Sequence, residues 1–214
     1  MDVTQIILAV MTAVCTIVTA WFGYNQKSHE RNTEARLARE KEEYERGRKE
    51  DILRAERESS RRRRHSAVIY GELGELRSDY DACRVYIAQP HPMGDIEKVS
   101  IYYEVKRKGV EDMRKHIQQL PLADIPQFGK TLAESAWIHY RSLDDVRDEV
   151  AHSLMSVAGT KQVFALRLLD VRDDWCGTLF VEYTRKCKVD EHRIRRSMEE
   201  VAKSIHLILP EYKE

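Results

Sequence analysis

The sequence predicts an all-α protein with a single N-terminal transmembrane helix, a long charged helix, and then a cytoplasmic bundle of five or six helices. Three observations lead to this fold class: an uncharged apolar run, a stretch dense in charge, and apolar residues recurring every three or four positions further on. That last spacing places side chains on one face of a helix. We therefore expect a transmembrane anchor at 1–24, a charged helical spacer at 25–65 and a helical domain at 66–214.

The apolar run covers residues 3–24 and contains no charged side chain. About 20 residues at roughly 1.5 Å each are enough to cross a hydrocarbon core of about 30 Å. The run is longer than a signal-peptide core, and no basic residue precedes it, so a permanent single-pass anchor is favoured over a cleaved signal. Asp2 precedes it, whereas Lys27 and Arg31 follow. The charge bias predicts an inner (plasma) membrane protein with its N-terminus outside and its C-terminal domain in the cytoplasm.

Small and polar residues form a seam along one side of this predicted helix. The small-residue seam consists of Gln5, Ala9, Thr12, Thr16, Thr19 and Gly23. Small residues let helices approach closely in lipid, so the seam predicts association with further copies of the chain. A pore lining is the alternative. Threonine hydroxyls can also bond to their own helix backbone, so the seam does not require water.

The spacer is dominated by charge. Between residues 27 and 64, 24 of 38 side chains are charged, ten acidic and fourteen basic. Acidic residues often precede basic ones by four positions, which stabilises a helix. Apolar residues keep no sustained heptad, so this is a poor coiled coil; a solvated helix is expected, with disorder as the alternative. Its end carries a basic cluster, Arg61, Arg62, Arg63 and Arg64. A solvated helix end is favoured there over binding of RNA or lipid head groups.

The remaining sequence predicts consecutive helices. Apolar periodicity indicates helices over 69–87, 95–120, 124–159 and 160–177, and a final one over 194–208. Residues 178–184 are predicted as either strand or helix. Their β-branched and aromatic side chains favour a strand, whereas the helical context favours a helix.

Motifs that identify common enzyme classes are missing. The chain has no HExxH, no Cys/His quartet, no phosphate-binding glycine loop and no GxSxG, so we expect no metal site and no cofactor. The formal net charge is zero, which excludes a chain-wide field that attracts nucleic acid. The four cysteines show no paired spacing and are expected to be reduced.

One short motif suggests chemistry. The segment from Arg147 to His152, RDEVAH, resembles the Rx4–6H motif of HEPN domains, which are all-helical and often metal-independent ribonucleases. The resemblance implies that Arg147 lies beside a scissile phosphate and that His152 transfers a proton. Solvated surface residues are the alternative interpretation.

The layout as a whole is similar to membrane-anchored HEPN-like accessory or effector proteins of bacterial antiviral defence. That resemblance implies a homo-oligomeric single-pass membrane protein that forms a pore or perturbs the bilayer. A membrane-tethered HEPN-like ribonuclease and a non-enzymatic scaffold that recruits a cytoplasmic protein remain as alternatives, and a non-enzyme is favoured. The expected partners are the lipid bilayer, further copies of the chain and a protein partner, with RNA weakly supported.

Overall fold

The computed structural model describes the backbone of residues 3–209 and the side chains of Met11, Cys15, Thr16, Thr19, Trp21, Tyr24 and 41–209. The chain divides into two compact units, Met1–Ser60 and Arg61–Glu214. Helix α1 (Val3–Asp79) contains the described part of the first unit and continues into the second. We describe each unit by itself.

In the first unit, α1 is a helix whose described side chains are largely exposed. Residues 41–58 are all exposed, as expected for a helix that is polar on every side. The hydroxyl of Thr19 donates to the carbonyl oxygen of Cys15 at 2.8 Å, so this hydroxyl is satisfied within its own helix. The exposed arginines Arg61 to Arg64 follow directly, at the start of the second unit.

The prediction of a transmembrane protein is contradicted. Across the part of the chain whose side chains are described, no helix is sufficiently long and apolar to cross a membrane. Acidic and basic residues recur every few positions from Lys41 to Arg64, so this stretch of α1 is too polar to cross a membrane. The inner-membrane location and the outward N-terminus are therefore corrected, whereas most side chains of the expected anchor at 1–24 lie outside the described residues. The side chains of Gln5, Ala9, Thr12 and Gly23 lie outside the described residues, so helix association through the seam stays a prediction.

The second unit is built on an antiparallel sheet of six strands, so the all-α prediction is wrong. The strand order is β3-β2-β1-β6-β5-β4, and every neighbouring pair is antiparallel. The strands are β1 (Arg84–Met93), β2 (Ile96–Lys106), β3 (Leu120–Pro121), β4 (Trp137–Tyr140), β5 (Gln162–Leu169) and β6 (Trp175–Tyr183). Residues 178–183, where strand and helix were both open, are strand.

The central strands lack a strand-like pattern in the sequence because helices and loops cover both of their faces. The first six residues of β1 and the last seven of β6 are all buried. A strand buried on both sides loses the alternation of polar and apolar residues, and its apolar run also satisfies a helical spacing. The helices predicted over 69–87, 95–120, 124–159 and 160–177 each contain strand residues.

Three α-helices and three 3₁₀ helices complete the described part of this unit. They are α2 (Pro126–Glu134), α3 (Glu149–Val157), α4 (Glu191–Ile205), η1 (Met113–Lys115), η2 (Leu122–Asp124) and η3 (Leu143–Asp145). Asp148 caps α3 and Asp190 caps α4, each accepting a hydrogen bond from a backbone amide of the first turn.

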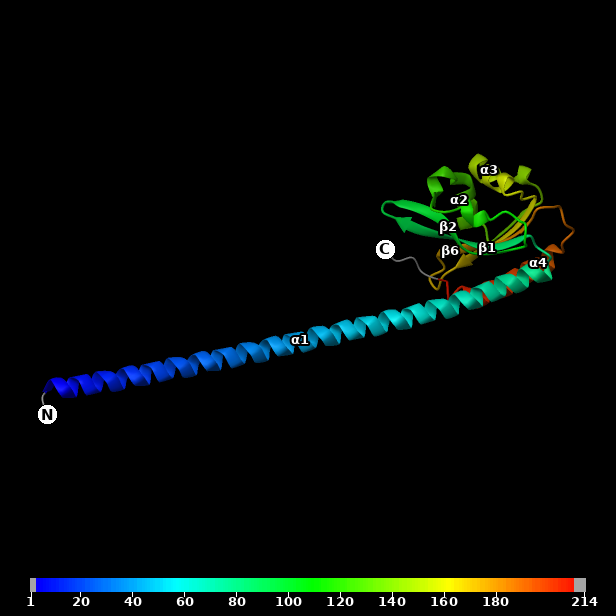
Figure 1. Ribbon diagram of the computed structural model, residues 1–214. Coiled ribbons are helices and arrows are strands. Elements are labelled where there is room, and N and C mark those ends of the chain that lie inside the picture. The colour runs from blue at the N-terminus through cyan, green and yellow to red at the C-terminus, as the bar shows by residue number, and fades with distance from the viewer. Residues whose placement is uncertain (1–2, 210–214) are drawn as a thin grey trace. The chain divides into compact units, whose positions relative to one another are not determined.

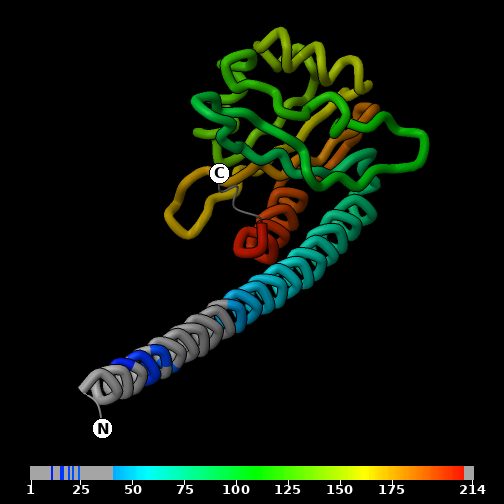
Figure 2. The backbone as a smooth tube through the Cα atoms, turned by 60° about the vertical axis from the view of Figure 1, so that its left-hand side comes forward, coloured from blue at the N-terminus to red at the C-terminus, as the bar shows by residue number. Residues whose placement is uncertain are grey.

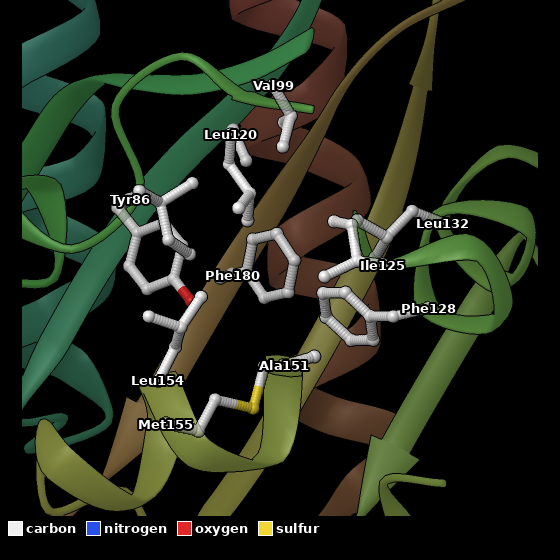
Figure 3. A pocket seen from close by; sticks show the side chains of 12 residues that line it. Tyr86, Val99, Leu120, Ile125, Phe128, Leu132, Ala151, Leu154, Met155 and Phe180 are labelled. Atoms are coloured by element: carbon white, nitrogen blue, oxygen red, sulfur yellow. The ribbon is translucent and has the colours of Figure 1, made fainter. Parts of the chain in front are cut away.

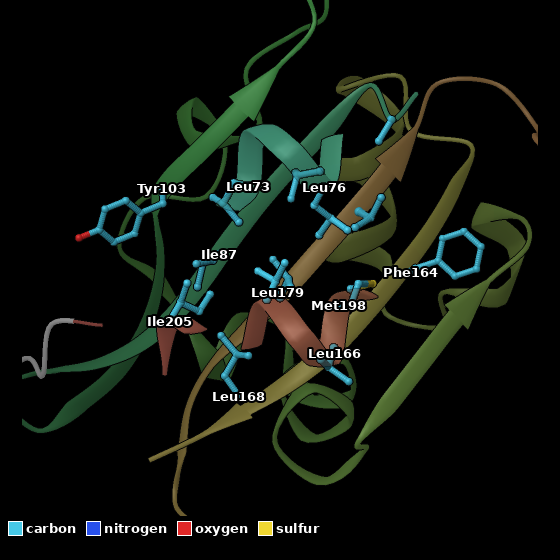
Figure 4. Close-up of a cluster of buried hydrophobic side chains, with 14 of the residues drawn as sticks. Leu73, Leu76, Ile87, Tyr103, Phe164, Leu166, Leu168, Leu179, Met198 and Ile205 are labelled. Atoms are coloured by element: carbon cyan, nitrogen blue, oxygen red, sulfur yellow. The ribbon is translucent and has the colours of Figure 1, made fainter. Parts of the chain in front are cut away.

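The helices form two layers, one on each face of the sheet (Figure 1). The last turns of α1 and helix α4 lie side by side on one face, as Figure 2 also shows, and contribute Leu73, Leu76, Met198 and Ile205 to the core in Figure 4. Helices α2 and α3 cover the other face. Successive residues of β1 point to opposite faces, so Ile87 packs toward α1 and α4 whereas Tyr86 packs toward α2 and α3.

Candidate functional site

A small apolar cavity lies between the sheet and the layer that contains α2 and α3. We call it the chamber. Strands β1, β2 and β6 supply one wall, and the segment from η1 to α3 supplies the rest (Figure 3). Its lining residues are Tyr86, Ala88, Val99, Ile117, Leu120, Ile125, Phe128, Leu132, Ala151, Leu154, Met155 and Phe180. The free space for the centre of a water-sized sphere is only about 10 Å³.

Aromatic rings fill much of the chamber. The rings of Tyr86 and Phe180 are stacked with their centroids 4.7 Å apart, and the ring of Phe128 lies 6.5 Å from that of Phe180. Burial of such rings provides a large part of a core's apolar area. The chamber is therefore closed in this conformation, and a larger ligand enters only if its walls move.

A buried polar network lies at the edge of the chamber. Arg84 and Glu182 are paired neighbours on β1 and β6, and both side chains are fully buried. The Arg84 guanidinium donates to Glu182 Oε2 at 3.0 and 2.7 Å, and to Thr160 Oγ1 at 2.6 Å. Its remaining nitrogen donates to the carbonyl oxygens of Glu111 and Ala158, each at 2.9 Å. This network joins both central strands to the segments before η1 and after α3.

The phenol of Tyr86, on β1, lines the chamber and belongs to this network. Tyr86 Oη donates to Glu182 Oε1 at 2.5 Å. Burial, together with the negative charge of Glu182, raises the pKa of Tyr86 well above its ordinary value. The phenol is therefore protonated at neutral pH and is already engaged, which leaves an almost wholly apolar surface facing the chamber.

A second carboxylate holds the wall that η1 provides. Glu104 on β2 accepts hydrogen bonds from the backbone amides of Met113 and Arg114, at 3.0 and 2.8 Å. Burial raises the pKa of Glu104 from 4.5 to about 7, with a further contribution from its hydrogen bond to Asp112, against the lowering effect of the two amides. The same hydrogen bond lowers the pKa of Asp112. The pair therefore shares a proton near neutral pH.

The free energy of unfolding is expected to fall as the pH rises from about 4.5 through about 7. The folded-state pKa of Glu104 lies above its unfolded value, so its contribution is complete below about 4.5 and is lost above about 7. Asp112 affects the free energy of unfolding in a separate pH range. Because its pKa is lowered, its stabilising contribution is lost only as the pH falls below 3.8. Carboxyl ¹³C titration should give a midpoint near 7 for Glu104, and Asp112→Asn should lower it. A midpoint near 4.5 in the native chain would contradict this.

The two residues of the predicted ribonuclease motif, Arg147 and His152, do not lie on one continuous helix. Arg147 is exposed in the loop before α3, Asp148 is the buried N-cap, and His152 is half-buried in the first turns of the helix. No interaction between Arg147 and His152 is observed. The segment spans a loop and a helix start instead of one continuous helix, and the HEPN-like interpretation is wrong.

Cysteines and potential metal ligands form no site within the described residues. Cys15, Cys83, Cys176 and Cys187 are free thiols, and burial raises the pKa of Cys176 to about 11. No group of three metal-ligating side chains occurs in the part of the chain that was described.

Comparisons with solved structures define the class of fold. No protein-family model matches the sequence, and no curated protein matches it. The structure is similar to the PixJ GAF domain of Thermosynechococcus elongatus, with a TM-score of 0.55 and 12% identity, over 69% of this chain and 88% of that one. A phycocyanobilin-bound GAF domain from a cyanobacterial phytochrome matches with a TM-score of 0.51 and 17% identity, over 69% and 93% of the two chains.

A third similar structure is the GAF domain region of a protein from Geobacter sulfurreducens PCA, with a TM-score of 0.54 and 11% identity, over 69% of this chain and 94% of that one. The chain therefore has a GAF-like fold, a mixed α/β fold with a central antiparallel sheet. This finding overturns the resemblance to defence effectors. It likewise gives no support to the predicted pore-forming protein, tethered ribonuclease or recruiting scaffold.

The chamber and its polar network were not predicted from the sequence. The available signal was a lone charge within each apolar run, Arg84 in CRVYIA and Glu182 in LFVEY. Charged residues are almost never fully buried unless they are paired. Two such residues in separate apolar runs indicate a buried pair, but only once both runs are recognised as strands.

Proposed function

We propose that this chain is a ligand-sensing module whose chamber takes a small apolar molecule. The observation that carries the proposal is the small apolar cavity between the sheet and α3, with its phenol already bonded to Glu182. Ligand sites are typically concave and mostly apolar. Several proteins of similar fold are sensory receptors or bind a bilin, and this likeness in fold makes a sensory role a reasonable choice.

The size of the chamber argues against a bilin. Pockets that enclose drug-sized ligands hold about 300–1,000 Å³, against about 10 Å³ for the centre of a water-sized sphere here. No cysteine lies among its twelve lining residues, so the lining offers no thiol for covalent attachment. A compact apolar ligand would need a much smaller displacement of the walls.

Helix α3 is the wall most suited to move. It has only nine residues, and Ala151 and Met155 are its buried side chains. Few buried apolar contacts characterise the segments that open locally at low free-energy cost. A ligand that binds only the open form would shift the population toward it.

The sheet connects the chamber to the opposite helical layer. Tyr86 and Phe180 face the chamber, whereas their neighbours Ile87 and Leu179 pack against α1 and α4. A close-packed sheet transmits small displacements from one face to the other. Occupancy of the chamber would thus alter the packing beneath the last turns of α1.

Benzene is expected to bind the chamber once its walls move apart, because an apolar cavity of about 150 Å³ admits benzene. Saturating benzene should raise the melting temperature of the full chain and shift the methyl NMR signals of Met155 and Leu154. Ala151→Val, which adds two methyl groups to the chamber wall, should abolish both effects. Ala202→Val on α4 is the matched control, since this half-buried alanine lies on the other face, and it should retain them.

Three results would count against the proposal. Benzene shifts that persist in Ala151→Val would place the binding elsewhere. Absence of any shift at saturation would show that the chamber is a plain core. Reconstitution with phycocyanobilin should give no visible absorbance, and a coloured product would replace the apolar-ligand proposal with a bilin site.

A further inference from the structure

A second cavity opens on the surface beside α2, outside the chamber. It is a half-open cleft of about 380 Å³, bounded by α2, β4 and the loop between η3 and α3. Its lining residues are Gln127, Phe128, Lys130, Thr131, Tyr140, Asp145, Arg147 and Asp148. Phe128 lines both the cleft and the chamber.

The cleft contains cationic and anionic side chains that form no ion pairs with one another. Two cations, Lys130 and Arg147, and two carboxylates, Asp145 and Asp148, line it. Among the described residues, none of these four takes part in an ion pair within 4.0 Å. Opposite charges that share a cleft without pairing are free to pair with a ligand that carries both.

The carboxylates are held in place by the backbone. Asp145 Oδ2 accepts hydrogen bonds from the amides of Arg141 and Ser142, at 2.9 and 3.1 Å. Asp148 accepts from the amides of Ala151 and Phe128, at 3.2 and 3.4 Å. These bonds fix the carboxylates and leave Asp145 Oδ1 without a partner within the described part of the chain. A fixed acceptor binds an ammonium group with little further ordering.

Two rings give the cleft an apolar wall. The rings of Phe128 and Tyr140 lie 6.5 Å apart at an angle of 31°, and both line the cavity. Burial and the charge of Asp145 raise the pKa of Tyr140, so its phenol is neutral at physiological pH. The wall therefore offers an apolar surface with a hydroxyl donor beside it.

This balance of charge selects a ligand class. A simple anion would meet the repulsion of Asp145 and Asp148, and a simple cation that of Lys130 and Arg147. A compact zwitterion avoids both penalties. We propose that the cleft binds a free α-amino acid with an apolar side chain: its ammonium at Asp145 and Asp148, its carboxylate at Lys130 and Arg147, and its side chain against Phe128 and Tyr140.

The test uses the full chain at neutral pH and low salt. Glycine, L-leucine and L-phenylalanine are titrated calorimetrically, together with 3-phenylpropanoate, which lacks the ammonium, and 2-phenylethylamine, which lacks the carboxylate. L-Phenylalanine or L-leucine should bind more tightly than glycine. Each phenyl analogue with one charge should bind about tenfold more weakly than L-phenylalanine, the factor that about 1.4 kcal/mol represents.

Variants locate the site. Arg147→Gln and Lys130→Gln each remove one exposed charge and should weaken binding of the amino acid about tenfold without changing the melting temperature. Arg193→Gln on α4 makes the same charge change at an exposed residue outside the cleft and should leave binding unchanged.

Three outcomes would overturn the proposal. Equal affinity for L-phenylalanine and 3-phenylpropanoate would make the cleft a simple anion site. Binding that survives both Arg147→Gln and Lys130→Gln would place the amino acid elsewhere. Absence of heat from all three amino acids at millimolar concentration would leave the cleft a solvated surface. None of these outcomes bears on benzene binding in the chamber, so the two proposals fail separately.

Discussion

Glu182→Gln is expected to lower the free energy of unfolding by about 3–5 kcal/mol, the loss typical when one partner of a buried ion pair is removed. The substitution keeps the shape of the side chain but leaves the Arg84 guanidinium, which is fully buried, without a counter-charge. It also removes the acceptor charge for Tyr86 and Thr160. Since a domain of this size is stable by only about 5–15 kcal/mol, the variant should be close to unfolding. Equilibrium urea denaturation measures the difference.

An exposed ion pair provides the matched control. Arg195 and Glu199 are 3.0 Å apart on α4, and both side chains are about half exposed. Glu199→Gln should cost less than about 1 kcal/mol, because water already solvates both charges. A loss from Glu182→Gln as small as that of the control would contradict the buried network.

A paired substitution tests the mechanism of that loss. Arg84→Met combined with Glu182→Leu removes both charges and should destabilise the chain less than Glu182→Gln alone. Apolar replacement of a whole buried ion pair is often neutral or stabilising, whereas breaking it is costly. A double variant less stable than the single one would show that the network's other hydrogen bonds dominate.

Leu73→Ala is expected to lower the free energy of unfolding by about 2–5 kcal/mol, the usual range for truncating a buried leucine. Leu73 has no exposed surface and packs with Leu76 from α1 and Met198 from α4. The substitution leaves a cavity beneath the last turns of α1. Urea denaturation of the full chain, followed by near-ultraviolet circular dichroism, measures the loss.

The same substitution elsewhere on α1 is the control. Leu53 lies in the first unit and is 51% exposed. Leu53→Ala removes no buried contact in the described structure and should change stability by no more than about 0.5 kcal/mol. Comparable losses at both positions would mean that the exposed stretch of α1 packs against something in solution, which the predicted homo-oligomer would explain.

The two helices of the α1 and α4 layer could be predicted from the sequence. The spacing of Leu73 and Leu76, and of Met198 and Ile205, predicts amphipathic helices, and these residues are buried in the structure. Each helix has one apolar stripe and one polar side, so its pattern is periodic and local. The end of the first helix could not be predicted. It was predicted to run to Ile87, whereas α1 ends at Asp79 and β1 begins at Arg84.

The candidate sites, unlike these two helices, could not be predicted from the sequence. The chamber combines residues from strands β1, β2 and β6 with residues from α2 and α3, and no spacing along the chain connects them. Arg147 was singled out for a ribonuclease motif, yet its neighbours in the cleft include Lys130 and Tyr140, which lie outside that motif. A motif of six residues reports local spacing only, whereas a site depends on segments brought together by folding.

By itself, the sequence determined the solvated character of the charged stretch and the amphipathic helices that border the sheet. Both follow from side-chain periodicity and charge, which act over a few residues. Only the tertiary structure decided that 84–106 and 162–183 form strand pairs, that Arg84 pairs with Glu182, and that an apolar chamber lies between the sheet and α3. The reason is burial on two faces. A segment covered on both sides has an apolar run without alternation, so the elements packed around it determine whether it is strand or helix.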